Sequence, residues 1–422
     1  MDWNFLTTGK DSLTVTTDSR KITRGCVFVA LRGEHFDGNQ FAQQALEMGA
    51  AYALVDEDIP ATCSQKREYD GKLIRVENTM AALQDLARAW VRKWRQTPSP
   101  LGKSRPVIAI TGTNGKTTTK ELTASVLSTR YRIHYTQGNY NNSLGVPLTL
   151  LQLNGSHELA VVEMGASHPG DIEELVQIVE PDYGLITNVG YAHLQGFGSF
   201  EGVMQTKGEL YDYLVAHNGS VFRNADNAYL SQMWEKATAG QSWSGQEYLY
   251  HREPMPDGTH LVGEYNAENI AAALCIGERF GIGREEGLQA IRAYIPSNNR
   301  SQAMQTTKNR LVVDAYNANY TSMQAALNSF DGDTYILGAM RELGDFSHTA
   351  HQNIVNMLLE RKAENVYLVG DEWKETTSPY PVSASAEELK EQIERKAISF
   401  ANQHILIKGS RSNRLEQLIE VL

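Results

Sequence analysis

The chain has 422 residues, 41% of them hydrophobic and 21% charged, which is typical of globular proteins and excludes a mainly disordered or fibrous chain. At about 150 residues per domain, this length predicts two or three domains. The 50 acidic and 39 basic residues give a net charge of −11, which excludes a generally basic surface for nucleic acid. An anionic ligand must therefore meet a local cluster of cations.

The cysteines and the amino-terminal run bear on the class of protein. Cys26, Cys63 and Cys275 lie far apart without a CxxC pair, which argues against a disulfide framework and against a zinc ribbon. The amino-terminal run MDWNFLTTGKDSLTV has neither the basic nor the apolar region of a signal peptide. No later stretch approaches the roughly 18 apolar residues of a spanning helix. We therefore expect a soluble, cytoplasmic protein without membrane insertion.

Two breaks in composition divide the chain. Residues 96–106 hold three prolines and a glycine, and separate an amphipathic run at Met80–Trp94 from an apolar strand at Val107–Ile110. A weaker break lies at residues 296–301, after a helical pattern at Glu285–Tyr294. The sequence therefore predicts three domains, at residues 1–105 with the linker, 106–296 and 297–422.

The second and third domains read as alternating strands and helices, which predicts α/β domains with mostly parallel sheets. In the central domain, the expected elements are strands at 107–110, 159–163 and 183–188, a helix from Lys116 and a helix at 171–179. In the last domain, which we expect to be Rossmann-like, they are strands at 311–314, 334–337, 366–369 and 405–408, and a helix at 386–400.

A phosphate-binding loop follows the first strand of the central domain, in the run TGTNGKTT at residues 111–118. Its glycines let backbone N–H groups turn toward phosphate oxygens at a helix N-terminus. Lys116 can reach terminal phosphates, and the Thr117 hydroxyl can ligate Mg²⁺. The loop departs from the full GxxxxGK[ST] pattern because Ile110 stands at the first glycine position. An empty glycine-rich turn is the alternative reading.

Two further side chains follow neighbouring strands, where open α/β sheets place their ligands. Glu163 ends one strand, and its carboxylate can order Mg²⁺, although an N-cap or a surface ion pair is the alternative. His193 follows the next strand, and a structural role is as good an interpretation of this imidazole.

Lys207 lies on the apolar face of an expected helix, with Val203, Leu210 and Leu214. An ammonium group there must snorkel to solvent, pair with an anion or change its chemistry. From this helix alone, snorkelling is the preferred interpretation.

The chain resembles the Mur ligase family along essentially its whole length. The resemblance rests on motifs in chain order: TDSR (17–20), TGTNGKTTTKE (111–121), GNYNNSLGVPLTLL (138–151), VVEMGASHPG (161–170), NADN (224–227), DAYNANYTSM (314–323), GAMRELG (338–344) and KGSR (408–411). The motifs are most similar to the member that adds D-alanyl-D-alanine.

The resemblance implies an N-terminal domain for a uridine nucleotide, a central ATPase domain, and a Rossmann-like C-terminal domain that closes over ATP. It implies ATP-dependent amide formation between UDP-N-acetylmuramoyl-tripeptide and D-alanyl-D-alanine, through an acyl phosphate. The enzyme would be a bacterial cytoplasmic monomer that makes a peptidoglycan precursor.

The resemblance also implies roles for individual residues. Lys116, Glu163, His193 and Lys207 would be catalytic, with two Mg²⁺ ions near Thr117, Glu163, His193 and a carbamylated Lys207. The remaining nucleotide-binding residues would be Gly112, Thr113, Asn114, Gly115, Thr118, Asn266, Asn269, Arg300 and Asp314. The other substrates would contact Ser19, Arg20, Phe36, Asp37, Asn139, Asn142, Tyr316, Asn317, Asn319, Lys408 and Arg411.

Some residues depart from the family pattern or stand outside it. Tyr265, Ala315 and Tyr320 replace a histidine, a serine and a proline that are common in relatives. His348 and His351, one helical turn apart, are interpreted as structural because no third metal ligand lies near them in the sequence. Two other functions stay open: a family member that adds another amino acid, and a nucleotide-binding switch protein without ligase activity.

Overall fold

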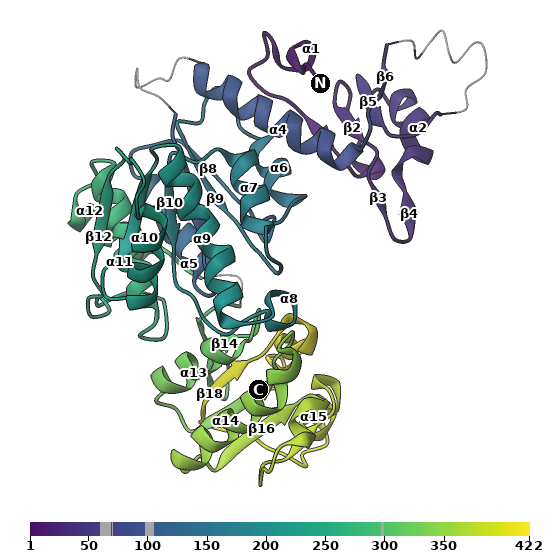
Figure 1. Cartoon of the computed structure of the whole chain (residues 1–422). Helices are drawn as coiled ribbons and strands as arrows, with labels where there is room; N and C mark the ends of the chain where they lie inside the picture. Colours follow the sequence, from purple (N-terminus) through teal and green to yellow (C-terminus); the bar gives the residue numbers. More distant parts are fainter. Residues whose placement is uncertain (60–68, 70, 98–104, 297–298) are drawn as a thin grey trace.

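Separate β-sheets, each formed by a continuous part of the chain, organise the structure (Figure 1). The computed structural model describes residues 1–59, 69, 71–97, 105–296 and 299–422. Residues 98–104 of the expected linker, residues 297–298 of the second break and Cys63 lie outside the described residues. Cys26 and Cys275 are free thiols. Within the described ranges, no helix is long and apolar enough to cross a membrane.

The N-terminal part contains a small parallel sheet and a separate hairpin. Its elements are α1 (Asn4–Thr7), β1 (Val15–Thr16), η1 (Ser19–Lys21), β2 (Val27–Val29), β3 (Arg32–Gly33), β4 (Phe36–Asp37), η2 (Gly38–Phe41), α2 (Ala42–Glu47), β5 (Tyr52–Val55), β6 (Leu73–Arg75) and α4 (Thr79–Gln96). The strand order is β1-β2-β5-β6, all parallel, and β3 pairs with β4 as an antiparallel hairpin.

Helix α4 connects this part to the central domain. Asn78 begins it as an N-cap, because its side chain accepts a hydrogen bond from the Ala81 amide. The buried face carries Trp90 and Trp94, whose indole N–H groups donate to the carbonyl oxygens of Leu153 and Asn154 at 2.9 and 3.0 Å. Although α4 also touches α1 and β5, its apolar face shares a core with the central domain.

The central domain is a doubly covered parallel sheet. Its elements are β7 (Val107–Thr111), α5 (Lys116–Leu127), β8 (Ile133–Tyr135), α6 (Gly145–Leu150), β9 (Leu159–Glu163), α7 (Asp171–Val179), β10 (Tyr183–Ile186), α8 (Leu194–Phe197), α9 (Phe200–Ala216), β11 (Ser220–Asn224), α10 (Ala228–Thr238), β12 (Glu247–Tyr250), α11 (Asn266–Arg279) and α12 (Arg284–Ala293). The strand order is β12-β11-β10-β7-β9-β8, and every pairing is parallel.

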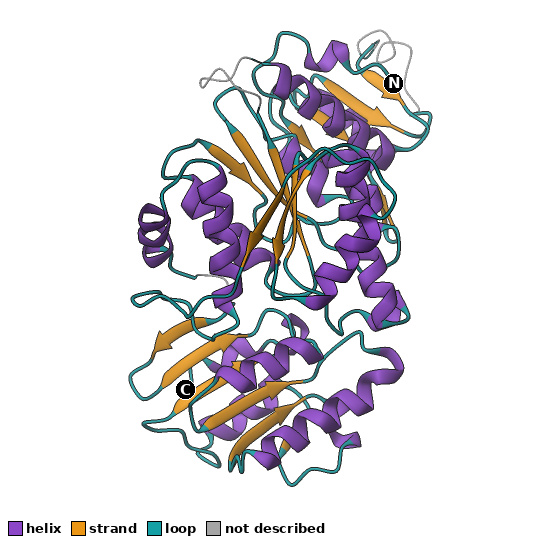
Figure 2. Ribbon diagram, turned by 60° about the vertical axis from the view of Figure 1, so that its left-hand side comes forward, coloured by secondary structure: helices purple, strands orange, loops and turns teal. Residues whose placement is uncertain are grey.

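Helices cover both faces of this sheet (Figure 2), and the two faces bury alternate residues of the same strand. In β7, Val107 and Ala109 pack in a core with α4, α6, α7 and α9, whereas Ile108 and Ile110 pack in a second core with α5, α11 and α12. Because both faces are covered, the strand is a continuous apolar run. The carboxyl ends of the strands are therefore the part of the sheet left for polar ligands.

The C-terminal domain is a second α/β layer with one antiparallel edge strand. Its elements are β13 (Gln302–Gln305), β14 (Arg310–Asp314), α13 (Tyr320–Ser329), β15 (Thr334–Gly338), η3 (Gly344–Phe346), α14 (Ser347–Glu360), β16 (Asn365–Val369), η4 (Asp371–Glu375), β17 (Val382–Ser383), α15 (Ala386–Glu394), β18 (His404–Lys408), η5 (Arg411–Asn413) and η6 (Leu415–Leu418). The strand order is β13-β14-β18-β15-β16-β17, and β13 alone runs antiparallel among these described strands.

The expected α/β fold is confirmed, and most of the expected elements differ from the observed ones by one or two residues at their ends. Strand β9 and helix α7 have the expected bounds. The helix expected at 386–400 is wrong in length, because α15 ends at Glu394 and Lys396 adopts a left-handed backbone with φ 59°. A non-glycine residue in that conformation cannot continue a right-handed helix.

Candidate active site

The phosphate loop joins β7 to α5 through a backbone that requires glycine at two positions. Gly112 and Gly115 have φ values of 137° and 79°. A Cβ on Gly112 would lie 2.1 Å from the Thr187 hydroxyl oxygen, and one on Gly115 would lie 2.4 Å from Asn269 Oδ1. Both the backbone conformation and the close neighbours therefore exclude a side chain here.

The loop after β10 holds the phosphate loop in place. Asn188 accepts hydrogen bonds from the Thr113 amide through its backbone oxygen, at 2.9 Å, and from the Asn114 amide through Oδ1, at 3.0 Å. The Thr187 hydroxyl donates to the Asn114 carbonyl oxygen at 2.6 Å. Two loop amides are thus already paired, so the amides that open α5 are the ones left for an anion. No local sequence pattern marks Thr187 or Asn188 as partners of the phosphate loop.

Lys116 folds back over the loop that precedes it. Its Nζ donates to the carbonyl oxygens of Gly112 and Thr113 at 2.7 and 3.0 Å. Burial lowers the pKa of Lys116 to about 8; the negative charge of Glu163 opposes this shift and the positive charge of Arg300 adds to it. Both hydrogen bonds of the ammonium group go to neutral carbonyl oxygens. An anionic phosphate would therefore be a better partner.

Glu163 ends β9 and is buried beside α5. Its Oε1 accepts hydrogen bonds from the Thr117 hydroxyl at 3.1 Å and from Asn141 Nδ2 at 2.8 Å. Its Oε2 is buried without a hydrogen-bond partner among the described residues, and the nearest cation is Lys120 Nζ at 4.0 Å. A buried carboxylate oxygen without a donor is costly unless a cation binds it. The Thr117 hydroxyl and this oxygen are the hard oxygen ligands that Mg²⁺ prefers.

Lys207 lies in the interior on α9, with 2% of its surface exposed. Its Nζ lies 3.4 Å from the Ala166 carbonyl oxygen and 5.3 Å from the centre of the Phe197 ring, and no carboxylate of the described residues pairs with it. Burial lowers the pKa of Lys207 well below its usual value; the positive charge of Lys116 adds to this shift. The snorkelling interpretation is therefore wrong, because the amine does not reach solvent.

His193 follows β10 and reaches toward the C-terminal domain. Its Nδ1 contacts the Glu342 carboxylate, and its backbone is left-handed with φ 51°. Burial lowers the pKa of His193, with the Glu342 carboxylate opposing and the positive charges of Lys116 and Lys207 adding to the shift. The four side chains that sequence analysis marked as catalytic are thus electrostatic neighbours.

The two domains also meet at the phosphate loop. Asn319, the N-cap of α13, pairs with Asn114 through both side-chain amides, with Nδ2 to Oδ1 distances of 2.8 and 3.5 Å. The Tyr191 amide donates to the Thr321 hydroxyl at 3.0 Å, and the rings of Tyr191 and Tyr320 lie 6.3 Å apart. The C-terminal domain is therefore docked directly against the loop.

The expected nucleotide residues lie on both sides of this junction. Asn269 accepts the Thr119 hydroxyl hydrogen bond and donates to Asn266 Oδ1, which places both amides beside the phosphate loop. Asp314, at the end of β14, pairs with the buried Lys408 at 2.5 Å. Arg300 stacks over Tyr316 with its guanidinium carbon 3.8 Å from the ring centre, and its buried Nε has no partner among the described residues.

A cavity of about 830 Å³ lies between the central and C-terminal domains. Both domains line it, with His193 and Gln195 on the central side. Of the residues expected to bind the other substrates, the cavity brings together Asn139, Tyr316, Asn317, Asn319 and Arg411. The carboxylate of Glu342, which sequence analysis did not mark, lies on the same wall.

The remaining expected substrate residues lie outside this cavity. Arg20 is exposed and pairs with Asp18 at 2.8 Å, next to Ser19 in η1, while Phe36 and Asp37 form β4 of the hairpin that stands apart from the central domain (Figure 1). Asn142 accepts a hydrogen bond from the Gly145 amide at the start of α6, which is a local structural contact.

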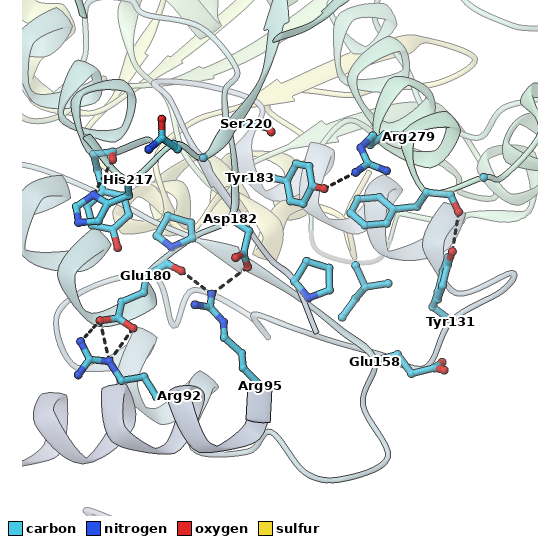
Figure 3. A pocket seen from close by; sticks show the side chains of 18 of the residues that line it. Arg92, Arg95, Tyr131, Glu158, Glu180, Asp182, Tyr183, His217, Ser220 and Arg279 are labelled. Carbon is cyan, nitrogen blue, oxygen red and sulfur yellow. Dashed lines mark hydrogen bonds and ion pairs between the residues drawn. The ribbon is translucent and has the colours of Figure 1, made fainter. Parts of the chain in front are cut away.

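A larger cavity of about 1240 Å³ lies at the opposite, amino end of the central sheet (Figure 3). Its arginines are already paired: Arg92 contacts Glu180, Arg95 pairs with Asp182 at 3.0 Å, and Arg279 donates to the Tyr183 hydroxyl at 2.7 Å. The phosphate loop and Glu163 lie at the other end of the strands. Size alone therefore does not identify the candidate active site.

Comparisons with known proteins agree with this geometry. Family models match in three places: the Mur ligase family, catalytic domain, at residues 14–91, the Mur ligase middle domain at 110–244, and the Mur ligase, glutamate ligase domain, at 299–418. Two similar relatives are the UDP-N-acetylmuramoyl-tripeptide–D-alanyl-D-alanine ligases of Bacillus subtilis, 32% identical over 97% of this chain and 92% of the relative, and of Escherichia coli, 34% identical over 97% and 93%.

Solved structures give the same result. A crystal structure of MurF from Acinetobacter baumannii is 28% identical and matches with a TM-score of 0.83 over 96% of this chain and 92% of the other. MurF ligase from Thermotoga maritima in complex with ADP is 25% identical, with a TM-score of 0.81 over 97% of each chain. The phosphate loop, the buried carboxylate beside it and the full-length similarity together establish that the chain belongs to the Mur ligase family.

Proposed function

We propose that this chain is an ATP-dependent ligase that joins D-alanyl-D-alanine to UDP-N-acetylmuramoyl-tripeptide in peptidoglycan precursor synthesis. The relatives that match it over nearly their whole length carry this activity in their names. The observation that carries the proposal is that the cavity between the central and C-terminal domains adjoins the phosphate loop, because Asn319 lines the cavity and pairs with Asn114 of the loop, so a nucleotide and an amine can meet there. The ATP requirement supports a cytoplasmic location in a bacterium, and we propose a monomer.

The reaction has two steps. A carboxylate oxygen of the tripeptide attacks the γ-phosphorus of ATP, ADP leaves, and an acyl phosphate forms. The dipeptide nitrogen then attacks the acyl carbon, inorganic phosphate leaves with its electron pair, and the nitrogen loses its proton. The first step brings a carboxylate against a triphosphate, so cationic groups are needed where the charges approach.

Lys116 supplies the first of these cations. Its ammonium group is bound only to two carbonyl oxygens, so a triphosphate can take it over without breaking an ion pair. The α5 amides and the helix N-terminus hold the phosphates at the same place. The nucleoside end is assigned to Asn266, Asn269, Arg300 and Asp314, since a carboxylate at a strand end suits ribose hydroxyls.

Mg²⁺ fits the donor set around Glu163. Thr117 and Glu163 would hold the ion, because Glu163 Oε2 is buried without a hydrogen-bond donor among the residues that the structure describes. When bound, the metal would supply charge neutralisation for the phosphates. His193 would orient groups at the domain junction.

Lys207 is proposed to carry a carbamate. A neutral amine attacks CO₂, the N–C bond forms and the nitrogen releases a proton, so a lysine whose pKa is lowered by burial is suited to the reaction. The carbamate would replace the ammonium group of Lys207 by an anion. The repulsion between Lys207 and Lys116, which contributes to the lowered pKa of Lys207, would then be removed.

The uridine end of the tripeptide substrate is assigned to the N-terminal domain, at Ser19, Arg20, Phe36 and Asp37. Asn139 and Asn142 would contact the muramoyl part.

The proposed order of steps predicts which mixtures release phosphate. Phosphate release from ATP is expected only when UDP-N-acetylmuramoyl-tripeptide and D-alanyl-D-alanine are both present, because the acyl phosphate forms on a bound carboxylate and the amine discharges it. The measurement is inorganic phosphate released by purified protein, with each substrate omitted in turn. Strong ATP hydrolysis without either substrate would favour the switch, and turnover with a different amine alone would favour another ligase.

The assignment of Asp314 to the ribose predicts an effect on nucleotide binding that can be separated from an effect on the chemical step. Asp314→Asn is expected to raise the KM for ATP about 10- to 100-fold with a smaller fall in kcat, because a charged hydrogen bond contributes about 1.5–3 kcal/mol. Asparagine keeps the shape next to the buried Lys408. Initial rates at varied ATP test this, with thermal unfolding as the control. A fall in kcat alone at unchanged KM would contradict the ribose assignment.

A further inference from the structure

Glu342 stands at the junction of the two domains in an uncommon backbone conformation. It lies between β15 and η3 with φ 61°, and its carbonyl oxygen accepts a hydrogen bond from the Gln195 amide of the central domain at 3.3 Å. Its carboxylate contacts the His193 ring. The left-handed region is unfavourable for a non-glycine residue, so the fold holds this residue there against a local preference.

The segment before Glu342 is fixed by a buried histidine. His351 Nε2 accepts a hydrogen bond from the Met340 amide at 3.1 Å, while its Nδ1 lies 2.8 Å from the Ser347 carbonyl oxygen. His351 is fully buried, so both nitrogens are committed to the backbone and the expected structural role fits these contacts. The result is a rigid turn that carries a carboxylate with 57% of its side chain exposed.

The charges on the cavity wall are unequally paired. Arg341 and Glu372, both of the C-terminal domain, contact each other. The Glu342 carboxylate has no partner in its own domain among the described residues, and its one cross-domain partner among them is the imidazole of His193. Arg411 has no carboxylate within ion-pair distance in the described part of the chain, and its guanidinium lies 5.8 Å from the centre of the Tyr316 ring. The cavity thus presents one available anion and one available cation.

We propose that Glu342 binds the ammonium group of the incoming dipeptide and thereby orients its amine toward the phosphate loop. This inference rests on the proposed function. A dipeptide at neutral pH carries an ammonium group at one end and a carboxylate at the other, which matches Glu342 and Arg411 on one cavity. Two extended residues span about 7 Å, and a cavity of about 830 Å³ has ample room for them.

The orientation follows from what surrounds each end. Glu342 lies against His193, and the positive charges of Lys116 and Lys207 act on the same imidazole. An amine bound at Glu342 therefore lies beside His193, on whose ring the charges of Lys116 and Lys207 act. Arg411, in the turn after β18, would then meet the carboxylate at the other end of the dipeptide.

A simpler role for Glu342 is to fasten the C-terminal domain to His193 without contacting substrate. The two roles predict different results for a ligand without an ammonium group. A fastening residue supports every ligand of the closed cavity equally. An ammonium-binding residue supports only ligands that carry the positive charge.

The experiment compares wild type, Glu342→Gln, Glu342→Asp and Glu372→Gln in the phosphate-release assay. The probes are D-alanyl-D-alanine as substrate and D-lactyl-D-alanine, in which a hydroxyl group replaces the ammonium group, as a competing inhibitor. Glu342→Gln is expected to raise the KM for the dipeptide at least about 10-fold, as expected for a lost charged contact, and to change the inhibition constant of the ligand without an ammonium group less than about 3-fold. Glu342→Asp, which keeps the charge, is expected to recover part of the loss.

Glu372→Gln is the matched control, because it removes the same charge from the same cavity at a residue that pairs with Arg341. Its KM for the dipeptide is expected to stay within about 2-fold of wild type. Equal weakening of both probes in Glu342→Gln, or an unchanged KM for the dipeptide, would overturn the inference. A wild-type protein that releases no phosphate with both substrates would instead refute the proposed function, so the two failures are distinguishable.

Discussion

Lys207→Ala is expected to lower the rate of ligation at least about 100-fold, since a metal-site anion and its electrostatic effect are lost together. In the folded chain, the Lys207 amine is buried, lies near Lys116 and contacts one carbonyl oxygen and the face of Phe197. As an unmodified cation it would repel the metal that Glu163 is proposed to hold. The carbamate gives that position the opposite charge.

Chemical rescue distinguishes this role from a packing role. Bicarbonate or a short carboxylic acid is expected to restore part of the activity of Lys207→Ala by placing a small anion in the vacated space. Lys207→Arg is expected to stay inactive, because a guanidinium group keeps the charge but cannot be carbamylated. Phosphate-release rates with and without added anion make the measurement, and the exposed Lys236 supplies a control variant, Lys236→Ala, with unchanged activity.

An active Lys207→Arg variant would refute the carbamate. So would intact-mass and crystallographic data that find an unmodified lysine in a metal-bound complex. In either case Lys207 would be a buried structural residue.

Lys116→Ala is expected to lose about 2–4 kcal/mol of transition-state stabilisation, mostly in kcat. The reason is that the ammonium group gains its anionic partner only when the triphosphate is bound and the transferring phosphoryl group develops charge. The measurement is kcat and KM for each substrate in the phosphate-release assay. Lys116→Arg tests geometry, because its planar guanidinium group keeps the charge but is larger than the ammonium group that donates to the carbonyl oxygens of Gly112 and Thr113.

A change confined to the KM for the dipeptide in Lys116→Ala would contradict the assignment of this loop. Thermal unfolding of the variant is the control, since the lysine also donates two hydrogen bonds to its own loop. A variant with wild-type stability and low kcat would locate the effect in the chemical step.

Local patterns predicted the strand, the turn and the helix of the phosphate loop, because these depend on residues that are adjacent in the sequence. The run from Gly112 to Thr117 contains the turn, the cation and the hydroxyl within one short segment. The position of Glu163 could also be predicted from the sequence, because a strand pattern fixes which residue stands at the carboxyl end of the strand. Strand β9 has the expected bounds.

Contacts between distant segments could not be predicted in the same way. Asn188 and Asn141 fix the phosphate loop and Glu163 from other loops, and no local pattern separates them from ordinary surface asparagines. The Glu342 carboxylate meets His193 only after the C-terminal domain docks. For Lys207 the sequence pattern favoured the wrong interpretation. An amphipathic helix allows a lysine to snorkel to solvent, and only the packing of α9 excludes this.

The packing of helix α4 against the central domain determines where segments can be exchanged between related chains. It follows the N-terminal sheet in sequence, yet Trp90 and Trp94 bury their rings against the central domain and donate to its carbonyl oxygens. A recombination crossover after α4 would remove both indoles from their partners, and loss of a buried aromatic ring costs about 3–5 kcal/mol. A crossover in residues 76–78, between β6 and α4, would instead transfer the sheet that is proposed to read the uridine nucleotide and leave the helix with its host. The short turn before α4 is therefore the position at which the proposed uridine-nucleotide domain can be exchanged without disturbing the ATPase core.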